Sequence, residues 1–149
     1  MTATRPVVFL DLEVYRNYFL CAVLHHGTGA VELFQKFDSH EDGSWDSEAL
    51  RERLLSCRVV TFNGLGYDIP LLMYALTGAT TADLKKASDR VILHNLKSWN
   101  FEREFRVTVN PPELDHVDLM EVAPMRGSLK LYGGRMHSQS IEDLPREPG

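Results

Sequence analysis

The chain has 149 residues, of which 44% are hydrophobic and 25% are charged, so it can bury one core and not two. Its mean hydropathy of −0.22 is that of a soluble globular protein and argues against global disorder. No apolar run approaches the roughly 18 residues of a membrane span, and no secretory signal pattern precedes the first strand-like segment, so we expect no membrane association. Cys21 and Cys57 lie in or beside apolar segments, which predicts free thiols and a cytoplasmic location.

The net charge of −5 argues against a general nucleic-acid coat protein, but the charge is unevenly distributed. Residues 1–75 hold 6 basic and 10 acidic side chains, whereas residues 85–106 hold 6 basic and 3 acidic ones. An acidic part with basic segments beside it fits an enzyme that holds metal ions at its centre and a polyanion around them. A solvated charged surface is the simpler explanation, and charge alone favours it.

Three β-rich runs open the chain, at 6–13, 18–24 and 31–37. The first contains four successive apolar residues, which predicts a strand buried on both faces. The glycine-containing link at 25–30 predicts a hairpin between the second run and the third.

A helix is expected after the polar loop that follows the third run. Asp46 or Ser47 can cap this helix, which should extend through Leu55. Its apolar face would consist of Leu50, Leu54 and Leu55.

A short buried strand at 58–62 leads through the glycine-containing turn 63–66 to a second helix. This helix should run from about Tyr67 to Gly78, with Pro70 in its first turn.

The second half of the chain shows weaker patterns. We expect a helix over 81–95 capped by Thr81, a short strand within 116–122 and a helix over 128–136. The order of elements predicts a mixed α/β fold in which a three-stranded antiparallel start feeds a parallel strand.

Asp11 and Glu13 end the first buried strand and are the most informative residues of the sequence. Residues i and i+2 of a strand point the same way, so both carboxylates should project to one side. Two such acids repel each other unless a cation lies between them, and Mg²⁺ and Mn²⁺ prefer carboxylate oxygen. The D-x-E pattern is short, however, and on its own it more often opens a solvent-exposed turn.

The segment 63–70 links a buried strand to a helix and places Asp68 in the first turn of that helix. A helix start favours a carboxylate through its dipole, so Asp68 has a structural explanation as a cap-region charge. Asn63 and the two glycines nevertheless shape a turn at the carboxyl end of a strand, where open α/β sheets bind their ligands.

Taken together, these segments resemble the DEDD 3′–5′ exonucleases of the RNase H-like superfamily. Residues 8–13 look like the first exonuclease motif of that family. Residues 61–70 are similar to the second motif, in the N-G-x-x-(F/Y)-D-x-P form of family B polymerase proofreading domains and related phage exonucleases. Three later segments resemble the part of that family's chain between its second and third motifs. They are residues 116–120, 128–132 and 141–145. The resemblance covers about 7–145 and implies an RNase H-like mixed sheet flanked by helices.

The resemblance implies hydrolysis of phosphodiester bonds at 3′ ends with two divalent cations, Mg²⁺ or Mn²⁺. Asp11 would bridge the two ions, Glu13 would hold one of them and Asp68 the other. Asn63 and Tyr67 would hold the terminal nucleotide, with the Tyr67 ring available for stacking. The structural alternatives are that Asn63 only closes an Asx-turn and that Tyr67 only starts a core helix.

The chain departs from the family at the third motif, which supplies a fourth carboxylate with a Tyr or His four or five residues before it. His137 lies six residues before Asp143, which is not that spacing. Asp118 is a conceivable replacement, although in the resemblance it lies in the connecting segment. We therefore expect one exonuclease-like domain over 1–149 that is a fragment incomplete at its C-terminal end, a split-gene product or a degenerate member.

Two further patterns are less specific. His25 and His26 in a hairpin turn could bind a transition metal, but a turn pair without nearby acids fits a surface role better. Three aromatic residues, Trp99, Phe101 and Phe105, lie among the basic residues Lys97, Arg103 and Arg106. They could form a stacking strip for single-stranded nucleic acid, or a two-faced strand with its apolar side packed inward.

The sequence thus predicts a metal-dependent 3′–5′ exonuclease, a hydrolase acting on single-stranded or frayed DNA ends, of the kind used in DNA replication. Its location would be the cytoplasm, or the host cytoplasm if a phage encodes it. The alternatives are an RNA-trimming nuclease of the same fold and a catalytically inactive module that binds nucleic acid or a replication protein. A downstream domain or a second polypeptide would supply the third motif.

Overall fold

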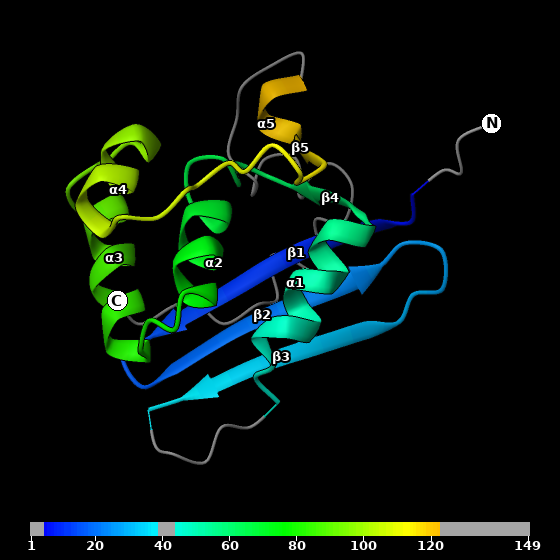
Figure 1. The fold of residues 1–149 in the computed structure, drawn as a ribbon, viewed down its shortest axis with the longest axis horizontal. Helices are drawn as coiled ribbons and strands as arrows, with labels where there is room; N and C mark the ends of the chain where they lie inside the picture. The colour runs from blue at the N-terminus through cyan, green and yellow to red at the C-terminus, as the bar shows by residue number, and fades with distance from the viewer. Residues whose placement is uncertain (1–4, 39–43, 123–149) are drawn as a thin grey trace, which may run out of the picture.

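A five-stranded sheet forms the centre of the computed structural model, which describes residues 5–38 and 44–122 (Figure 1). The strands are β1 (Val7–Tyr15), β2 (Tyr18–His25), β3 (Val31–Phe37), β4 (Arg58–Thr61) and β5 (His116–Asp118). Their order in the sheet is β3-β2-β1-β4-β5. The first three strands pair antiparallel, whereas β4 and β5 run parallel to β1.

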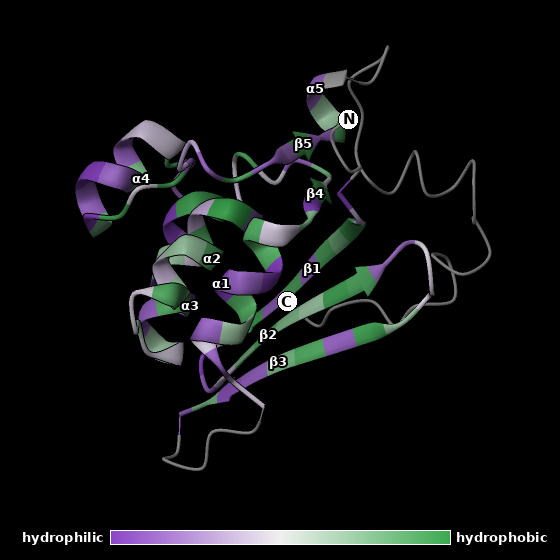
Figure 2. Ribbon diagram, turned by 45° about the vertical axis from the view of Figure 1, so that its right-hand side comes forward, coloured by the Kyte–Doolittle hydropathy of each residue, from purple (hydrophilic) through white to green (hydrophobic). Residues whose placement is uncertain are grey.

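Helices cover one face of this sheet. The helices in the described ranges are α1 (Ser47–Ser56), α2 (Asp68–Leu76), α3 (Thr81–Ile92), α4 (Ser98–Phe105) and α5 (Leu119–Val122). Figure 2 shows α1, α2 and α3 on the same side of the strands, and all three contact the sheet.

The apolar core lies between this helical layer and the sheet. Burial alternates along β1, where Val8, Leu10 and Leu12 are buried and the residues between them are more exposed. α2 is apolar almost all round, with Ile69 and Leu72 fully buried, as expected for a central helix. The first turn of α2 is therefore held firmly over the sheet.

The other face of the sheet carries exposed apolar side chains. Successive residues of a strand point to opposite faces, so Asp11 and Glu13, which alternate with buried leucines, also lie on this face. The strand register places them there together with the large exposed apolar residues Tyr15, Leu24, Val31, Leu33 and Phe37. We call these five residues the open apolar face.

Most of the predicted elements are confirmed. The mixed α/β fold with an antiparallel start and a parallel continuation is as predicted. The first three strands lie within two residues of their predicted limits, and Asp46 caps α1 by accepting a hydrogen bond from the Ala49 N–H (3.0 Å). Cys21 and Cys57 are buried free thiols.

The predicted cap of α3 was wrong by one residue. Thr80, not Thr81, accepts a hydrogen bond from the Asp83 N–H (3.1 Å), and the Asp83 carboxylate accepts one from the Thr80 N–H (3.1 Å). This reciprocal capping box satisfies two N–H groups that a cap at Thr81 would leave open. The helix also ends at Ile92 rather than Asn95, which has a left-handed backbone with φ of 56°.

Side-chain directions on two helices correct further predictions. Leu55 is exposed, whereas Leu50 and Leu54, one turn apart on α1, are buried in the core. The aromatic segment is helix α4 and not a two-faced strand, and Phe101 and Phe105 share one helix face at the i, i+4 spacing.

Within 116–122, only His116–Asp118 forms a strand, and Leu119–Val122 begins a helix. The predicted helix over 128–136 and the residues His137 and Asp143 lie outside the described residues. No helix in the described ranges is long and apolar enough to cross a membrane.

Candidate functional site

The turn between β4 and α2 forms one wall of the candidate site. Asn63 has a left-handed backbone conformation, with φ of 60°. Gly64 packs against the end of β4, because a Cβ atom at this position would lie 2.0 Å from the Thr61 Oγ1 atom. Only glycine permits this close approach, so residue 64 ties the turn to the end of the strand.

Asp118 at the end of β5 holds this turn from the neighbouring strand. Its side chain is 5% exposed, and its Oδ1 atom accepts hydrogen bonds from the backbone N–H groups of Asn63 (2.7 Å) and Met120 (3.0 Å). Its Oδ2 atom accepts a third from the backbone N–H of Leu65 (3.1 Å). These charge-assisted hydrogen bonds fix the turn that precedes α2.

Asp68 is the first residue of α2 and follows the turn directly. Burial raises the pKa of its carboxyl group to about 7, and the negative charges of Asp11 and Asp118 add to the rise. The dipole of α2 acts in the opposite direction, since it favours a negative charge at the helix start. Desolvation and repulsion outweigh the dipole, so a favourable cap-region charge does not describe Asp68.

Asp11 and Glu13 do not end the first strand as predicted, because β1 continues to Tyr15. Asp11 is the fifth residue of β1 and lies just past the level at which the parallel strand β4 ends. Partial desolvation raises the pKa of Asp11, against a hydrogen bond from the Leu12 backbone that lowers it. The charge of Asp11 acts on Asp68, and the charge of Glu13 contributes to a raised pKa of the Tyr67 hydroxyl, whose first cause is burial. All three predicted acids therefore lie within electrostatic reach of the β4–α2 turn.

Asn63 and Tyr67 have different surroundings. Asn63 is exposed, and its side-chain amide makes no hydrogen bond within the described part of the chain, so the Asx-turn is not seen. Asp118 closes the turn instead. Tyr67 is half-buried, and its hydroxyl is hydrogen-bonded to Ser88 Oγ (2.8 Å), which links α2 to α3. Tyr67 thus has the packing role expected of a core helix start while still lining the site.

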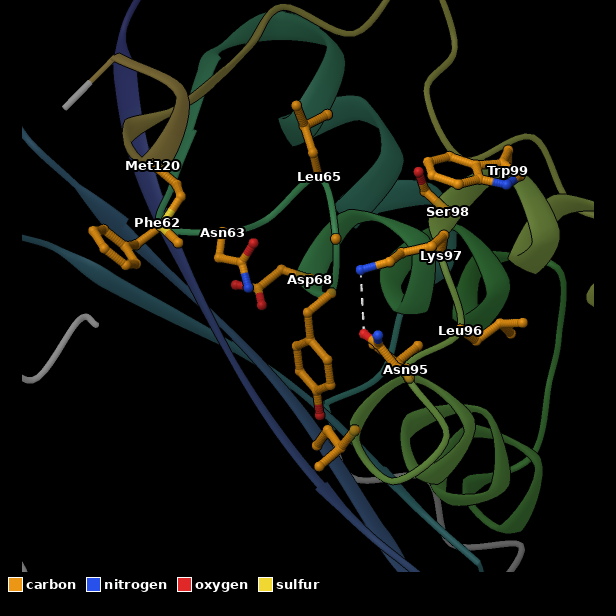
Figure 3. A pocket seen from close by; sticks show the side chains of 14 residues that line it. Phe62, Asn63, Leu65, Asp68, Asn95, Leu96, Lys97, Ser98, Trp99 and Met120 are labelled. Atoms are coloured by element: carbon orange, nitrogen blue, oxygen red, sulfur yellow. Dashed lines mark hydrogen bonds between the residues drawn. The ribbon is translucent and has the colours of Figure 1, made fainter. Parts of the chain in front are cut away.

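A cavity of about 700 Å³ lies beside the turn (Figure 3). One wall consists of residues 62–63 and 65–68, which include Asn63, Tyr67 and Asp68. The opposite wall comes from residues 91–92 and 95–99, at the end of α3 and the start of α4, and Met120 closes one end. The cavity thus brings together segments that are separated in the sequence.

The second wall contains Asn95, which sequence analysis did not place in a site, and Lys97, which it named among the basic residues beside the aromatic side chains. Asn95 and Lys97 line the cavity, and the Lys97 Nζ atom donates a hydrogen bond to Asn95 Oδ1 (3.2 Å). No sequence signal singled out Asn95.

The predicted aromatic strip is not continuous. Trp99 is 66% exposed and lines the cavity, whereas Phe101 is fully buried and packs against Phe105 at a ring distance of 4.6 Å. A contiguous stacking surface formed by all three rings is therefore wrong, and Trp99 alone is available to a ligand.

The surroundings of His25 also differ from those that the sequence predicted. His25 does have an acid nearby, since its Nε2 atom lies 2.5 Å from the Glu32 Oε1 atom. Glu32 also accepts two hydrogen bonds from Arg53 (2.6 and 2.9 Å), which joins α1 to β3. This group ties the hairpin to a helix and leaves no reason to place a metal there.

The fit of the site to divalent cations depends on its donor atoms. Among residues 5–38 and 44–122, no group of three or more His, Cys, Asp or Glu side chains is arranged to hold a metal ion. The chemistry of Asp11 and Asp68 nevertheless fits a cation, because both are carboxylates with raised pKa values and the charge of Asp11 acts on Asp68. Asp118 fits less well, since three backbone N–H groups already occupy its oxygens.

Protein-family models, curated proteins and solved structures were compared with the chain, and none matches it. Function therefore has to be inferred from the residues of this chain and their arrangement.

Proposed function

We propose that the protein is a metal-dependent 3′–5′ exonuclease that hydrolyses phosphodiester bonds at single-stranded or frayed DNA ends. The observation that carries this proposal is that the charge of Asp11, on β1, acts on Asp68, which starts α2 just after the end of the parallel strand β4 and lines an open cavity. Ligand sites of open α/β sheets occur at such strand ends.

The architecture supports an RNase H-like assignment within this proposal. That fold was expected to begin with three antiparallel strands and to continue with parallel ones. The order β3-β2-β1-β4-β5, with β4 and β5 parallel to β1, agrees with this expectation. The two motif-like segments also lie on neighbouring strands, β1 and β4, as one shared site requires.

Each site residue has a proposed role. Asp11 and Glu13 would hold divalent ions from β1, and Asp68 would hold one from α2. When bound, such ions supply an activated water and charge stabilisation for an in-line displacement at phosphorus. Asn63, whose amide is exposed at the cavity, would bind the terminal nucleotide, and Tyr67 would support it from the cavity wall.

A fourth carboxylate is still required by this proposal. Asp118 is a poor candidate, because moving it to a metal would break three hydrogen bonds that shape the turn. We therefore propose that an acid outside the described residues completes the site.

Metal-dependent stabilisation tests the ligand assignment. Mn²⁺ should raise the thermal midpoint of the chain, because a bound cation relieves the repulsion between Asp11 and Asp68. Asp11→Ala should abolish this rise, whereas Asp38→Asn, which removes one charge at an exposed position outside the site, should preserve it. A rise that persists in the Asp11→Ala, Glu13→Ala double variant would contradict the assignment.

Hydrolysis tests the activity itself. A 3′-labelled single-stranded DNA should lose its label with Mn²⁺ and keep it in EDTA. Asp68→Asn should lower the rate by orders of magnitude while the chain stays folded. Degradation of RNA alone would favour an RNA-trimming nuclease. Binding of nucleic acid with no hydrolysis under either condition would favour the inactive module.

A further inference from the structure

The wall of the cavity that faces the β4–α2 turn presents an exposed indole. Trp99 lies in the first turn of α4 and is 66% exposed. The same helix is anchored by Phe101, which is fully buried and lies 6.2 Å from the ring of Tyr74. Trp99 is therefore held in place by packing on the other side of its helix, and its own ring remains free to contact a ligand.

A cation lies next to this indole. Lys97 is exposed, and the contact the structure gives its ammonium group is with a neutral amide, that of Asn95 (Figure 3). No carboxylate pairs with Lys97 in the part of the chain that the structure describes. The Lys97 side chain can therefore bind an anion without first breaking an ion pair.

The two walls of the cavity differ in charge. Asp68 stands on one wall and repels anions, whereas Lys97 and Trp99 stand on the other. A ligand that suits both walls carries an anionic group at the Lys97 side and a flat uncharged ring against the indole. A nucleotide within a single strand has these two parts joined at a short distance, and base–aromatic stacking accepts any base.

We propose that this cavity is a base-binding subsite for single-stranded nucleic acid, in which a nucleobase stacks on Trp99 and an adjoining phosphate contacts Lys97. This inference rests on the proposed exonuclease function and adds the surface that holds the strand. The volume of about 700 Å³ is within the range of small-ligand pockets.

Tryptophan fluorescence tests the stacking contact directly, because the chain has two tryptophans and Trp45→Phe leaves Trp99 as the single one. The emission of this variant should be quenched by a single-stranded oligodeoxynucleotide, in EDTA or with Ca²⁺ in place of the catalytic ions. An oligonucleotide with abasic residues at its 3′ end should quench much less, since it keeps the phosphates and lacks the rings.

Affinity for a 5′-labelled oligonucleotide gives a second measurement. Trp99→Ala should weaken binding roughly 5- to 150-fold, and Trp99→Phe, which keeps an aromatic face, should weaken it less. Lys97→Gln should lower the slope of log affinity against log salt by about 0.7, the value for one lost phosphate contact on a single strand. Leu93→Ala is the matched control, because Leu93 is exposed on the same connection and does not line the cavity.

The outcomes separate the subsite from the nuclease. Metal-dependent hydrolysis with unquenched Trp99 emission, and wild-type affinity in Trp99→Ala, would overturn the subsite and leave the exonuclease intact. Quenching that requires the bases, without hydrolysis under any condition, would support the subsite and overturn the exonuclease. Equal quenching by intact and abasic strands would also overturn the stacking contact.

Discussion

Asp68 shows how the surroundings of one residue outweigh a favourable local position. Its place at the start of α2 should favour a charged carboxylate. Burial and the charges of Asp11 and Asp118 instead raise its pKa to about 7. A residue kept at such a cost is typical of a binding or catalytic site rather than of a helix cap.

The stability of the protein without divalent metal should therefore depend on Asp68 and on pH. The folded-state pKa of about 7 lies above the ordinary value of 3.8, so the protonated carboxyl favours the folded state. This contribution is complete below about pH 4 and is lost as pH rises through 7. In EDTA at pH 8, Asp68→Asn should raise the free energy of unfolding by roughly 1–3 kcal/mol, and by nothing measurable near pH 4.

Urea unfolding across this pH range is the measurement, and Asp38→Asn is the control for the loss of one negative charge. A destabilised Asp68→Asn variant at pH 8 would show that the carboxylate stabilises the helix start after all.

The same substitution at Asp118 is expected to lower the free energy of unfolding, whereas at Asp68 it should raise it. Asp118→Asn replaces one acceptor oxygen by an NH₂ group, which would face a backbone N–H donor at the turn. We expect a loss of about 2–4 kcal/mol in the free energy of unfolding, measured by urea denaturation. Asp115→Asn removes the same charge three positions earlier, from exposed pairs with Arg5 and Arg58, and should cost under 1 kcal/mol. Similar losses in the two variants would argue against the anchoring role.

At the scale of elements, two adjacent threonines at the start of α3 have different roles. Thr80 caps the helix, whereas Thr81 is buried and its hydroxyl has no hydrogen-bond partner among the described residues. Thr80→Ala should lower the free energy of unfolding by about 1 kcal/mol. Thr81→Val, which keeps the shape and removes the unsatisfied hydroxyl, should be neutral or stabilising. Thermal midpoints of both variants provide the test, and a larger loss in Thr81→Val would mean that Thr81 is the cap.

The α4 segment shows why its structure was hard to predict. The aromatic residues at 99, 101 and 105, all at odd-numbered positions, fit a strand as well as a helix when only the pattern is considered. Packing of Phe101 and Phe105 against Tyr74 of α2 selects the helix, because the i, i+4 spacing brings both rings to one partner. The same choice turns Trp99 away from the core.

For the molecule as a whole, the helical layer on one face of the sheet leaves the open apolar face exposed to solvent. Val31 and Leu33 are 57% and 46% exposed on it. Apolar side chains gathered on one face favour contact with other apolar groups.

An apolar fluorescent dye such as ANS should therefore bind to the folded chain. Leu33→Lys should lower the dye fluorescence while changing the free energy of unfolding by less than about 0.5 kcal/mol, because Leu33 already lies in solvent. Leu93→Lys changes an exposed leucine away from this face and serves as the control. An equal decrease in the two variants would show that the dye does not report on this face.

Local sequence patterns were enough to predict the strands, the main helices and the positions of the motif acids. Runs of apolar β-branched residues predicted the first three strands, and the two-residue period of a strand placed Asp11 and Glu13 on one face. Turn and helix-start residues likewise placed Asp68 at the beginning of α2. These properties depend on neighbours in the sequence, so they could be read from short segments.

The tertiary structure alone decided how these parts act on one another. Asp118 lies 55 residues from Asn63, and its role as the anchor of the turn exists only because β5 pairs beside β4. The exposure of Trp99 depends in the same way on the packing of its helix against α2. Burial, electrostatic repulsion and long-range hydrogen bonds arise between segments that meet only in the folded chain, and for that reason the sequence predicted Asp68 but not the cavity that it lines.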